Sequence, residues 1–123
     1  MSDLYNTYPP TGGKVILNTN YGPIEIELFT KECPLACRNF IQLCLEGYYN
    51  NKAFHRIIND FMIQAGGDEP TIYDKDFKDE FHSRIKFKIK GLIACVNRNK
   101  INSNTNQFFK KYCSFDNPNI TYF

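Results

Sequence analysis

Short runs of alternating apolar and polar residues recur along this chain, and the clearest pair lies near its N-terminus. Residues 24–29 alternate aliphatic side chains with glutamates, and residues 14–19 repeat the same period of two. The intervening Asn20-Tyr21-Gly22 has the composition of a tight turn. These runs predict a β-hairpin with one buried face. Further short strands are predicted at residues 54–58, 61–65, 91–97, 107–109 and 120–123.

One longer segment has the helical period instead. Pro34 suits the first turn of a helix and Gly47 its end, which predicts a helix over residues 34–46. The inward stripe is predicted to be Cys37, Phe40, Ile41 and Cys44, and the water-facing side Arg38, Asn39, Gln42 and Glu46. Many short strands with one amphipathic helix predict a mainly β fold, an antiparallel barrel or sandwich that the helix caps.

The length of 123 residues fits one domain with a substantial core. Residues 1–12 contain Pro9-Pro10 and predict an extended tail, so the domain is assigned to residues 13–123. Residues 97–106 include five asparagines and predict a polar loop.

Charge and cysteine content narrow the possible functions. A net charge of +2 is too small to indicate nucleic-acid binding by itself, and no apolar run is long enough to span a bilayer. Without a leader pattern, we expect a nuclear or cytoplasmic location. The five cysteines show neither a paired framework nor zinc-finger spacing, so we interpret them as buried free thiols and expect no metal.

A basic run at residues 84–90 alternates four cations with three apolar residues. One interpretation is a docking strip for an acidic partner or for RNA. The other is a solvated strand face whose lysines discourage edge-to-edge pairing. No aromatic stacking platform accompanies the charges, which favours the second interpretation and makes direct nucleic-acid binding an unlikely function.

The segment around Arg56 carries the most specific chemistry. Two short β-like runs joined at Asn59-Asp60 bring together a cation, the amide of Gln64 and the bulky side chains Phe61 and Met62. A prolyl peptide fits this combination, because its ring needs apolar walls while its amide needs a donor that stays protonated. Without further information, core packing would be the simpler interpretation of the apolar residues.

Three separated blocks together resemble the cyclophilins, the peptidyl-prolyl isomerases that bind cyclosporin. They are residues 54–64 with the glycines that follow, residues 91–97, and Gln107-Phe108-Phe109. The hairpin and the helix before them also fit the family. Residues 9–11, 37–44 and 77–84 are most similar to the spliceosome-associated nuclear cyclophilins. The resemblance covers nearly the whole chain from about residue 8, and it implies a cyclophilin-like antiparallel β-barrel.

The resemblance also implies a site. Arg56 matches the family's catalytic arginine, and no cofactor is expected. The substrate-binding residues implied by the match are Phe61, Met62 and Phe109 as the wall of the proline pocket, and Gln64, Asn97 and Gln107 as the polar groups that hold the peptide backbone. Spacing adds Val96, Phe115 in place of a pocket leucine, and Asn119 in place of a pocket histidine. His55 matches a residue with a structural role.

This chain departs from the family in several places. Val96 and Arg98 flank Asn97 where small residues are usual, and Arg98 is expected to bring a second cation to the rim of the pocket. Ser114 stands where many members have a tryptophan that supports cyclosporin binding, so cyclosporin affinity is expected to be weak. The loop after the glycines is shortened. Members continue with another helix and a closing strand, so the domain is expected to be incomplete at its C-terminal end, with an open edge on the first hairpin.

Two functions follow from these features. The first is a peptidyl-prolyl cis-trans isomerase that assists protein folding or remodelling and acts on proline-containing segments, with the spliceosome as a candidate setting. The second is a cyclophilin scaffold of weak or absent activity that binds such segments beside spliceosomal proteins. Arg56 and Gln64 favour the enzyme, whereas Val96, Arg98 and Ser114 favour the scaffold.

Overall fold

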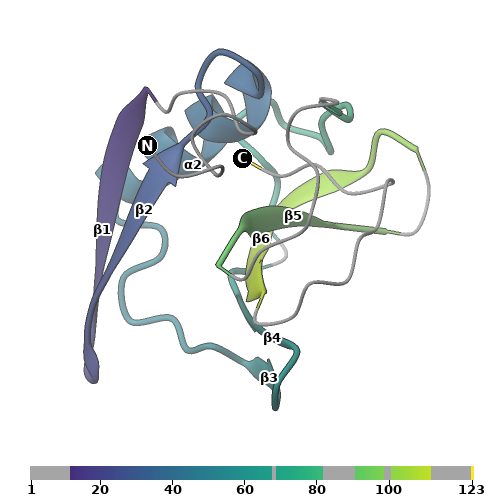
Figure 1. Cartoon of the computed structure of the whole chain (residues 1–123). Coiled ribbons are helices and arrows are strands. Elements are labelled where there is room, and N and C mark those ends of the chain that lie inside the picture. Colours follow the sequence, from purple (N-terminus) through teal and green to yellow (C-terminus); the bar gives the residue numbers. More distant parts are fainter. Residues whose placement is uncertain (1–11, 68, 82–90, 99–100, 112–122) are drawn as a thin grey trace, which may run out of the picture.

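The computed structural model describes residues 12–67, 69–81, 91–98, 101–111 and 123. Several predictions fall outside these ranges: the tail over residues 1–11, the basic run 84–90, most of the last predicted strand, and the candidate site residues Phe115 and Asn119. The described elements are β1 (Gly13–Thr19), β2 (Gly22–Leu28), α2 (Pro34–Leu45), β3 (Arg56–Ile58), β4 (Met62–Ala65), β5 (Ile93–Asn97) and β6 (Asn104–Lys111) (Figure 1). The mainly β class with a single described helix is confirmed.

Strands β1 and β2 form the predicted antiparallel hairpin, with Val15 opposite Ile26. Their alternation produces the expected burial, because Ile26 and Leu28 enter the core while the alternating Glu25 and Glu27 remain exposed. Gly22 closes the turn with a φ of +120°, a conformation that L side chains rarely adopt. The turn prediction is therefore confirmed.

The other four strands form one antiparallel sheet in the order β3-β4-β6-β5. β3 begins at Arg56, so the predicted strand at residues 54–58 started too early. β6 begins at Asn104, so the prediction of a polar loop up to residue 106 was wrong at its end. Asn104 and Asn106 are buried because their side-chain amides donate hydrogen bonds to backbone carbonyls of residues 69–77. These bonds offset the cost of burying the side-chain N–H groups.

Phe123 links the two sheets through its backbone. Its N–H donates to the Ile93 carbonyl at 3.0 Å, and its carbonyl accepts from the Phe29 N–H at 2.9 Å. Ile93 opens β5, and Phe29 directly follows β2. The hairpin and the four-stranded sheet are thereby held in one structure.

Helix α2 lies at one end of the two sheets (Figure 1), and its apolar stripe packs into the core that they share. The Phe40 ring lies at the centre of the contact, with ring centroids 5.4 Å from Tyr49, 5.3 Å from Phe108 and 5.2 Å from Phe123. Cys37 and Phe40 are buried as predicted. The prediction that Asn39 faces water was wrong, because its side chain is only 3% exposed and bonds to Asn106 and to the Ile72 N–H.

The first turn of α2 is capped by a residue from a distant loop. The helix has no side-chain cap from its own Cys33, so its first amides need acceptors from elsewhere. The Glu80 carboxylate accepts from the Leu35 N–H at 3.0 Å and from the Ala36 N–H at 2.8 Å. A negative charge at this end is also favoured by the helix dipole.

Glu80→Gln should therefore lower the free energy of unfolding by about 1–2 kcal/mol, because it removes the charge and one of the two accepting oxygens. Urea denaturation measures the change. The control is Glu27→Gln, which removes the same charge from an exposed position on β2. Equal small effects of the two variants would contradict the capping role.

Four of the cysteines fall among the described residues, and all four are free. Burial raises the pKa of Cys37 to about 12 and that of Cys44 to about 11, and it raises the pKa of Cys33 and Cys95 as well. No cluster of three or more His, Cys, Asp or Glu residues suited to a metal occurs in the described part of the chain. No helix within it is long and apolar enough to cross a membrane.

These thiols should react slowly in the native protein. At pH 8 a thiol of pKa 11 is only about one part in a thousand thiolate, and thiolate is the reactive species. In a Cys113→Ser background, which leaves the four described thiols, we expect release of nitrothiobenzoate to be at least about a hundredfold slower than from free cysteine. Urea should restore fast reaction of all four. Rapid labelling of a native thiol would show that it is accessible.

Candidate functional site

A row of side chains crosses the four-stranded sheet on one face. Arg56 pairs with Gln64, Gln64 with Phe109, and Phe109 with Ala94. Directly paired residues in antiparallel strands project to the same face, and so do residues two apart on one strand. Met62 and Gln107 therefore share the face of Arg56. Five of the residues predicted from the sequence are thus brought together by strand register.

The two glutamines on this face are tied to each other. Gln64 is buried, and its Nε2 donates to the Gln107 Oε1 at 2.6 Å. The Thr105 hydroxyl fixes the backbone just before Gln107. It donates to the Val96 carbonyl at 2.9 Å and accepts from the Gln107 N–H at 3.2 Å. The amide groups are thus fixed in position before any ligand arrives, which lowers the entropy lost on binding.

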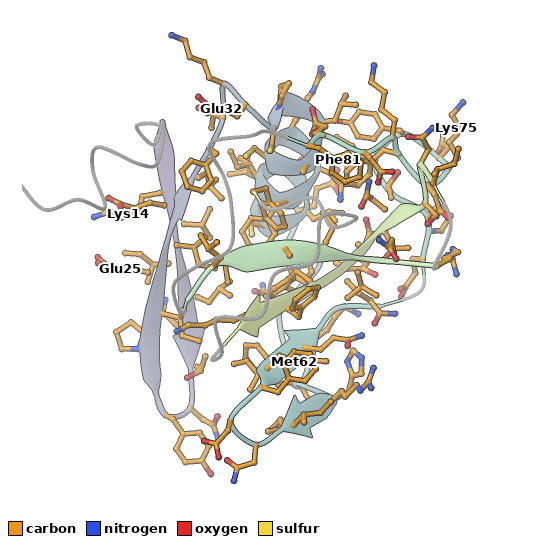
Figure 2. All side chains as sticks on the ribbon, turned by 45° about the vertical axis from the view of Figure 1, so that its right-hand side comes forward. Lys14, Glu25, Glu32, Met62, Lys75 and Phe81 are labelled. Carbon is orange, nitrogen blue, oxygen red and sulfur yellow. The ribbon has the colours of Figure 1, made fainter. Side chains whose placement is uncertain are left out.

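The apolar part of the face lies beside the cation. Met62 is buried at the start of β4 (Figure 2), and Phe109 is half-buried against the core. Phe61 lies in the β3–β4 turn, where its N–H donates to the Ile58 carbonyl at 3.0 Å and its ring is exposed. Arg56 is exposed as well, so an aromatic ring and a cation of this region are both accessible to an approaching peptide.

Val96 and Asn97 lie on the neighbouring strand β5, both half-buried. The register shifts between Cys95 and Asn97, and Asn97 pairs with Asn104. The next residue, Arg98, donates from Nε to the Asp76 Oδ2 at 2.8 Å. The cation that the sequence places at the rim is therefore paired with a carboxylate of the 69–81 loop.

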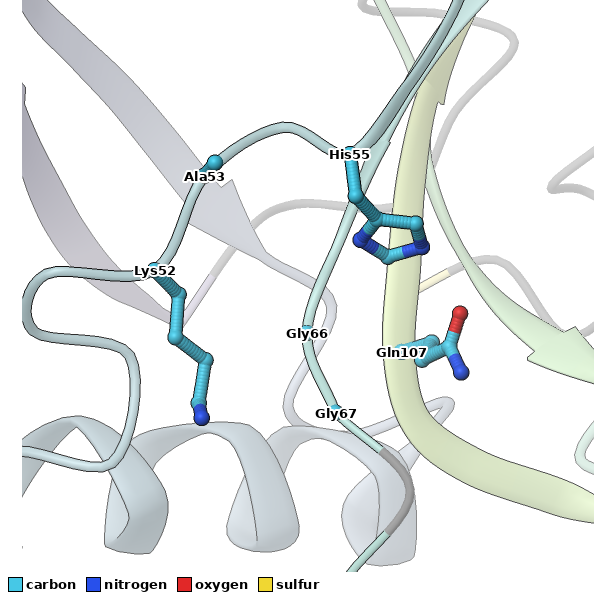
Figure 3. A pocket seen from close by; sticks show the side chains of 6 residues that line it. All are labelled: Lys52, Ala53, His55, Gly66, Gly67 and Gln107. Atoms are coloured by element: carbon cyan, nitrogen blue, oxygen red, sulfur yellow. The ribbon is translucent and has the colours of Figure 1, made fainter.

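A hollow of about 290 Å³ adjoins this face and was not predicted from the sequence. It is lined by Lys52, Ala53, His55, Gly66, Gly67 and Gln107 (Figure 3). Gly66 has a φ of +113°, and a Cβ there would lie 2.8 Å from the Gln107 Cα, so this wall requires glycine. The glycine pair and the shortened loop after it were the available signals in the sequence.

A buried amide pair supports the strand that carries Gln107. Asn39 on α2 donates from Nδ2 to the Asn106 Oδ1 at 3.1 Å. The Asn106 carbonyl accepts from the Tyr49 hydroxyl at 2.8 Å, and its Nδ2 donates to the Glu69 and Pro70 carbonyls. Burial raises the pKa of Tyr49 far above its usual range, so its hydroxyl remains a donor. The helix, the loop and β6 are thus connected directly behind the site.

This arrangement can hold an extended peptide and present it to a permanent cation. It combines an exposed guanidinium, fixed amides and apolar walls, and the thiols nearest the core have pKa values raised far above neutrality. Such groups can polarise and orient an amide, and they do not need to form a covalent bond to it.

Comparisons with known proteins agree with this geometry. A family model described as cyclophilin-type peptidyl-prolyl cis-trans isomerase/CLD matches residues 14–122. The peptidyl-prolyl cis-trans isomerase CYP57 of Arabidopsis thaliana is 50% identical over 117 residues, which cover 89% of this chain and 23% of that protein. The spliceosome-associated protein CWC27 homolog of Xenopus laevis is 50% identical over 115 residues, which cover 89% and 24%.

Solved structures show the same similarity. A cyclophilin-type peptidyl-prolyl cis-trans isomerase of Cryptosporidium parvum, crystallised in the presence of the dipeptide Ala-Pro, matches with a TM-score of 0.86 and 36% sequence identity. The match covers 90% of this chain and 76% of that one. The chain spans about a quarter of the length of the curated relatives described above.

Proposed function

Since this chain belongs to the cyclophilin-type peptidyl-prolyl cis-trans isomerase family, we propose that it catalyses isomerisation of X–Pro bonds with Arg56 as its catalytic residue. Rotation about the bond faces a barrier of roughly 18–20 kcal/mol, although the two isomers differ by only about 1 kcal/mol. The catalyst has to lower this barrier without shifting the equilibrium, so no nucleophile or redox group is required.

The residues of this face suit that task. The Arg56 guanidinium donates toward the prolyl nitrogen and favours its pyramidal form, in which amide resonance is already lost. Phe61, Met62 and Phe109 hold the proline ring while the preceding chain turns. Because the twisted amide is less polar than the planar one, a partly dry pocket also favours the transition state.

Backbone contacts to the substrate are assigned to polar residues around this face. Gln64, Asn97 and Gln107 bind the peptide on either side of the proline, with Val96 as part of the floor. The assignment is supported by the 2.6 Å hydrogen bond between the Gln64 and Gln107 side chains, which orients both amides. Phe115 and Asn119 complete the proposed substrate-binding set on the strength of their spacing in the sequence alone.

The observation that carries the proposal is the register that aligns Arg56, Gln64 and Phe109 across three strands. Exchange NMR on a short prolyl peptide tests it. We expect the cis and trans resonances to exchange faster in the presence of this protein than in its absence. Exchange at the uncatalysed rate would exclude the enzyme and leave a peptide-binding scaffold.

The scaffold remains the second candidate because of particular residues near the site. Val96 narrows the floor of the proposed proline pocket, and the Arg98–Asp76 ion pair adds bulk at one side of that pocket. Relatives named as spliceosome-associated are similar over most of this chain, so we propose proline-containing segments of splicing proteins as partners and the nucleus as the location. Weak affinity for cyclosporin is proposed from Ser114.

A further inference from the structure

The hollow beside the proposed proline site has a cation at one side. Figure 3 shows Lys52 on one side of the Gly66–Gly67 backbone and His55 and Gln107 on the other. Gln107 belongs to the peptide-binding face, and His55 precedes Arg56. The hollow therefore begins where the proposed site ends, within reach of a residue that flanks the bound proline.

The Lys52 ammonium lies beside an aromatic ring and a carboxylate. Its Nζ lies 4.5 Å from the centroid of the Tyr48 ring and 3.9 Å from the Glu69 Oε1. The second distance exceeds that of a charged hydrogen bond, which is about 2.7–2.9 Å. The ring attracts the ammonium and restricts its position. Within the described residues, neither of these two contacts is a hydrogen bond of ordinary length, so the ammonium can still donate to another anion.

One oxygen of the Glu69 carboxylate has a different partner. Its Oε2 accepts from the Tyr48 hydroxyl at 2.7 Å, and this bond lowers the pKa of the Glu69 carboxyl. Glu69 is therefore ionised at neutral pH and is the negative charge that an incoming anion would have to displace from Lys52. Among the described residues, the titratable side chains around this hollow are Lys52, His55, Tyr48 and Glu69.

We propose that this hollow is a specificity subsite that takes an acidic side chain of the bound peptide, with Lys52 as its partner. The inference rests on the proposed function, because it assumes a proline segment on the neighbouring face. The volume of about 290 Å³ leaves room for a short side chain, since a water molecule in the liquid occupies about 30 Å³.

Two matched peptide series test the subsite. Each peptide carries one proline and either glutamate or glutamine at one flanking position, which is varied in turn. Exchange NMR gives kcat and KM, and amide chemical-shift titration gives Kd independently of turnover. At the best position we expect a KM and a Kd about two- to fivefold lower for glutamate, with similar kcat, as befits one exposed ion pair.

Three variants should change the preference for glutamate in different ways. Lys52→Gln should abolish the preference for glutamate, whereas Glu69→Gln should increase it by removing the competing carboxylate. Lys14→Gln should leave it unchanged, because Lys14 pairs with Glu25 on the hairpin (Figure 2) and does not line this hollow. Added salt should reduce the preference of the wild type.

The results distinguish failure of the proposed subsite from failure of the proposed isomerase activity. Equal KM and Kd for glutamate and glutamine at every position, or a preference that survives Lys52→Gln, would overturn the subsite while catalysis stands. If neither peptide is isomerised but the Kd difference is present and is lost in Lys52→Gln, the subsite is supported and the enzyme reading fails.

Discussion

Arg56→Ala is expected to lower kcat/KM for prolyl isomerisation by about a hundredfold, the usual effect of removing one donor that stabilises a transition state. The Kd of the peptide should change far less, because in the proposed mechanism the guanidinium bonds the pyramidal nitrogen and makes no comparable bond to the planar amide. Exchange NMR measures turnover, and shift titration of the same sample measures binding.

Two further variants test whether the loss of turnover is specific to the Arg56 guanidinium. Arg38→Ala removes the same side chain from an exposed position on α2 and should leave turnover unchanged. Arg56→Lys should fall between wild type and alanine, because lysine keeps the charge and loses the planar fork of donors. Turnover that is unaffected by Arg56→Ala would show that another group performs the chemistry.

Phe40→Ala should lower the free energy of unfolding by about 3–5 kcal/mol, more than the other substitutions considered, because it leaves a cavity at the centre of the aromatic cluster. The side chain is 2% exposed and packs its ring against Tyr49, Phe108 and Phe123. The free energy of unfolding of a small domain seldom exceeds about 15 kcal/mol, so this loss would be a large share of the total stability. In urea, the unfolding midpoint should fall by more than about 1 M.

Leu45→Ala is the matched control on the same helix. Leu45 is 78% exposed, so its truncation should change the free energy of unfolding by less than about 0.5 kcal/mol. Similar losses for the two variants would mean that helix propensity, and not packing in the core, determines the contribution of α2.

The secondary structure was predictable where burial follows a local period. The alternation in residues 24–29 and the stripe containing Phe40 depend only on which face meets the core. Asn39 could not be predicted in this way, because its partners are Asn106 and the Ile72 N–H, which are distant in sequence. For the same reason, the asparagines of residues 97–106 suggested a loop, although Asn104 and Asn106 are buried in β6.

Members of the candidate site could be named from the sequence, but their surroundings could not be predicted from it. Arg56, Gln64 and Gln107 were named from the resemblance, and strand register brings them to one face. The pairing of Arg98 with Asp76 and the position of Lys52 over the Tyr48 ring depend on how loops meet in space. Neither has a periodic signal in the sequence.

The remote cap on α2 has a consequence for how the molecule assembles. The amides of Leu35 and Ala36 obtain their acceptor from a residue about 45 positions later in the chain. The helix can therefore complete its first turn only after the segment around Glu80 has docked, so local helix formation and long-range loop closure become a single cooperative event. Hydrogen exchange at these two amides thus reports how often that segment detaches.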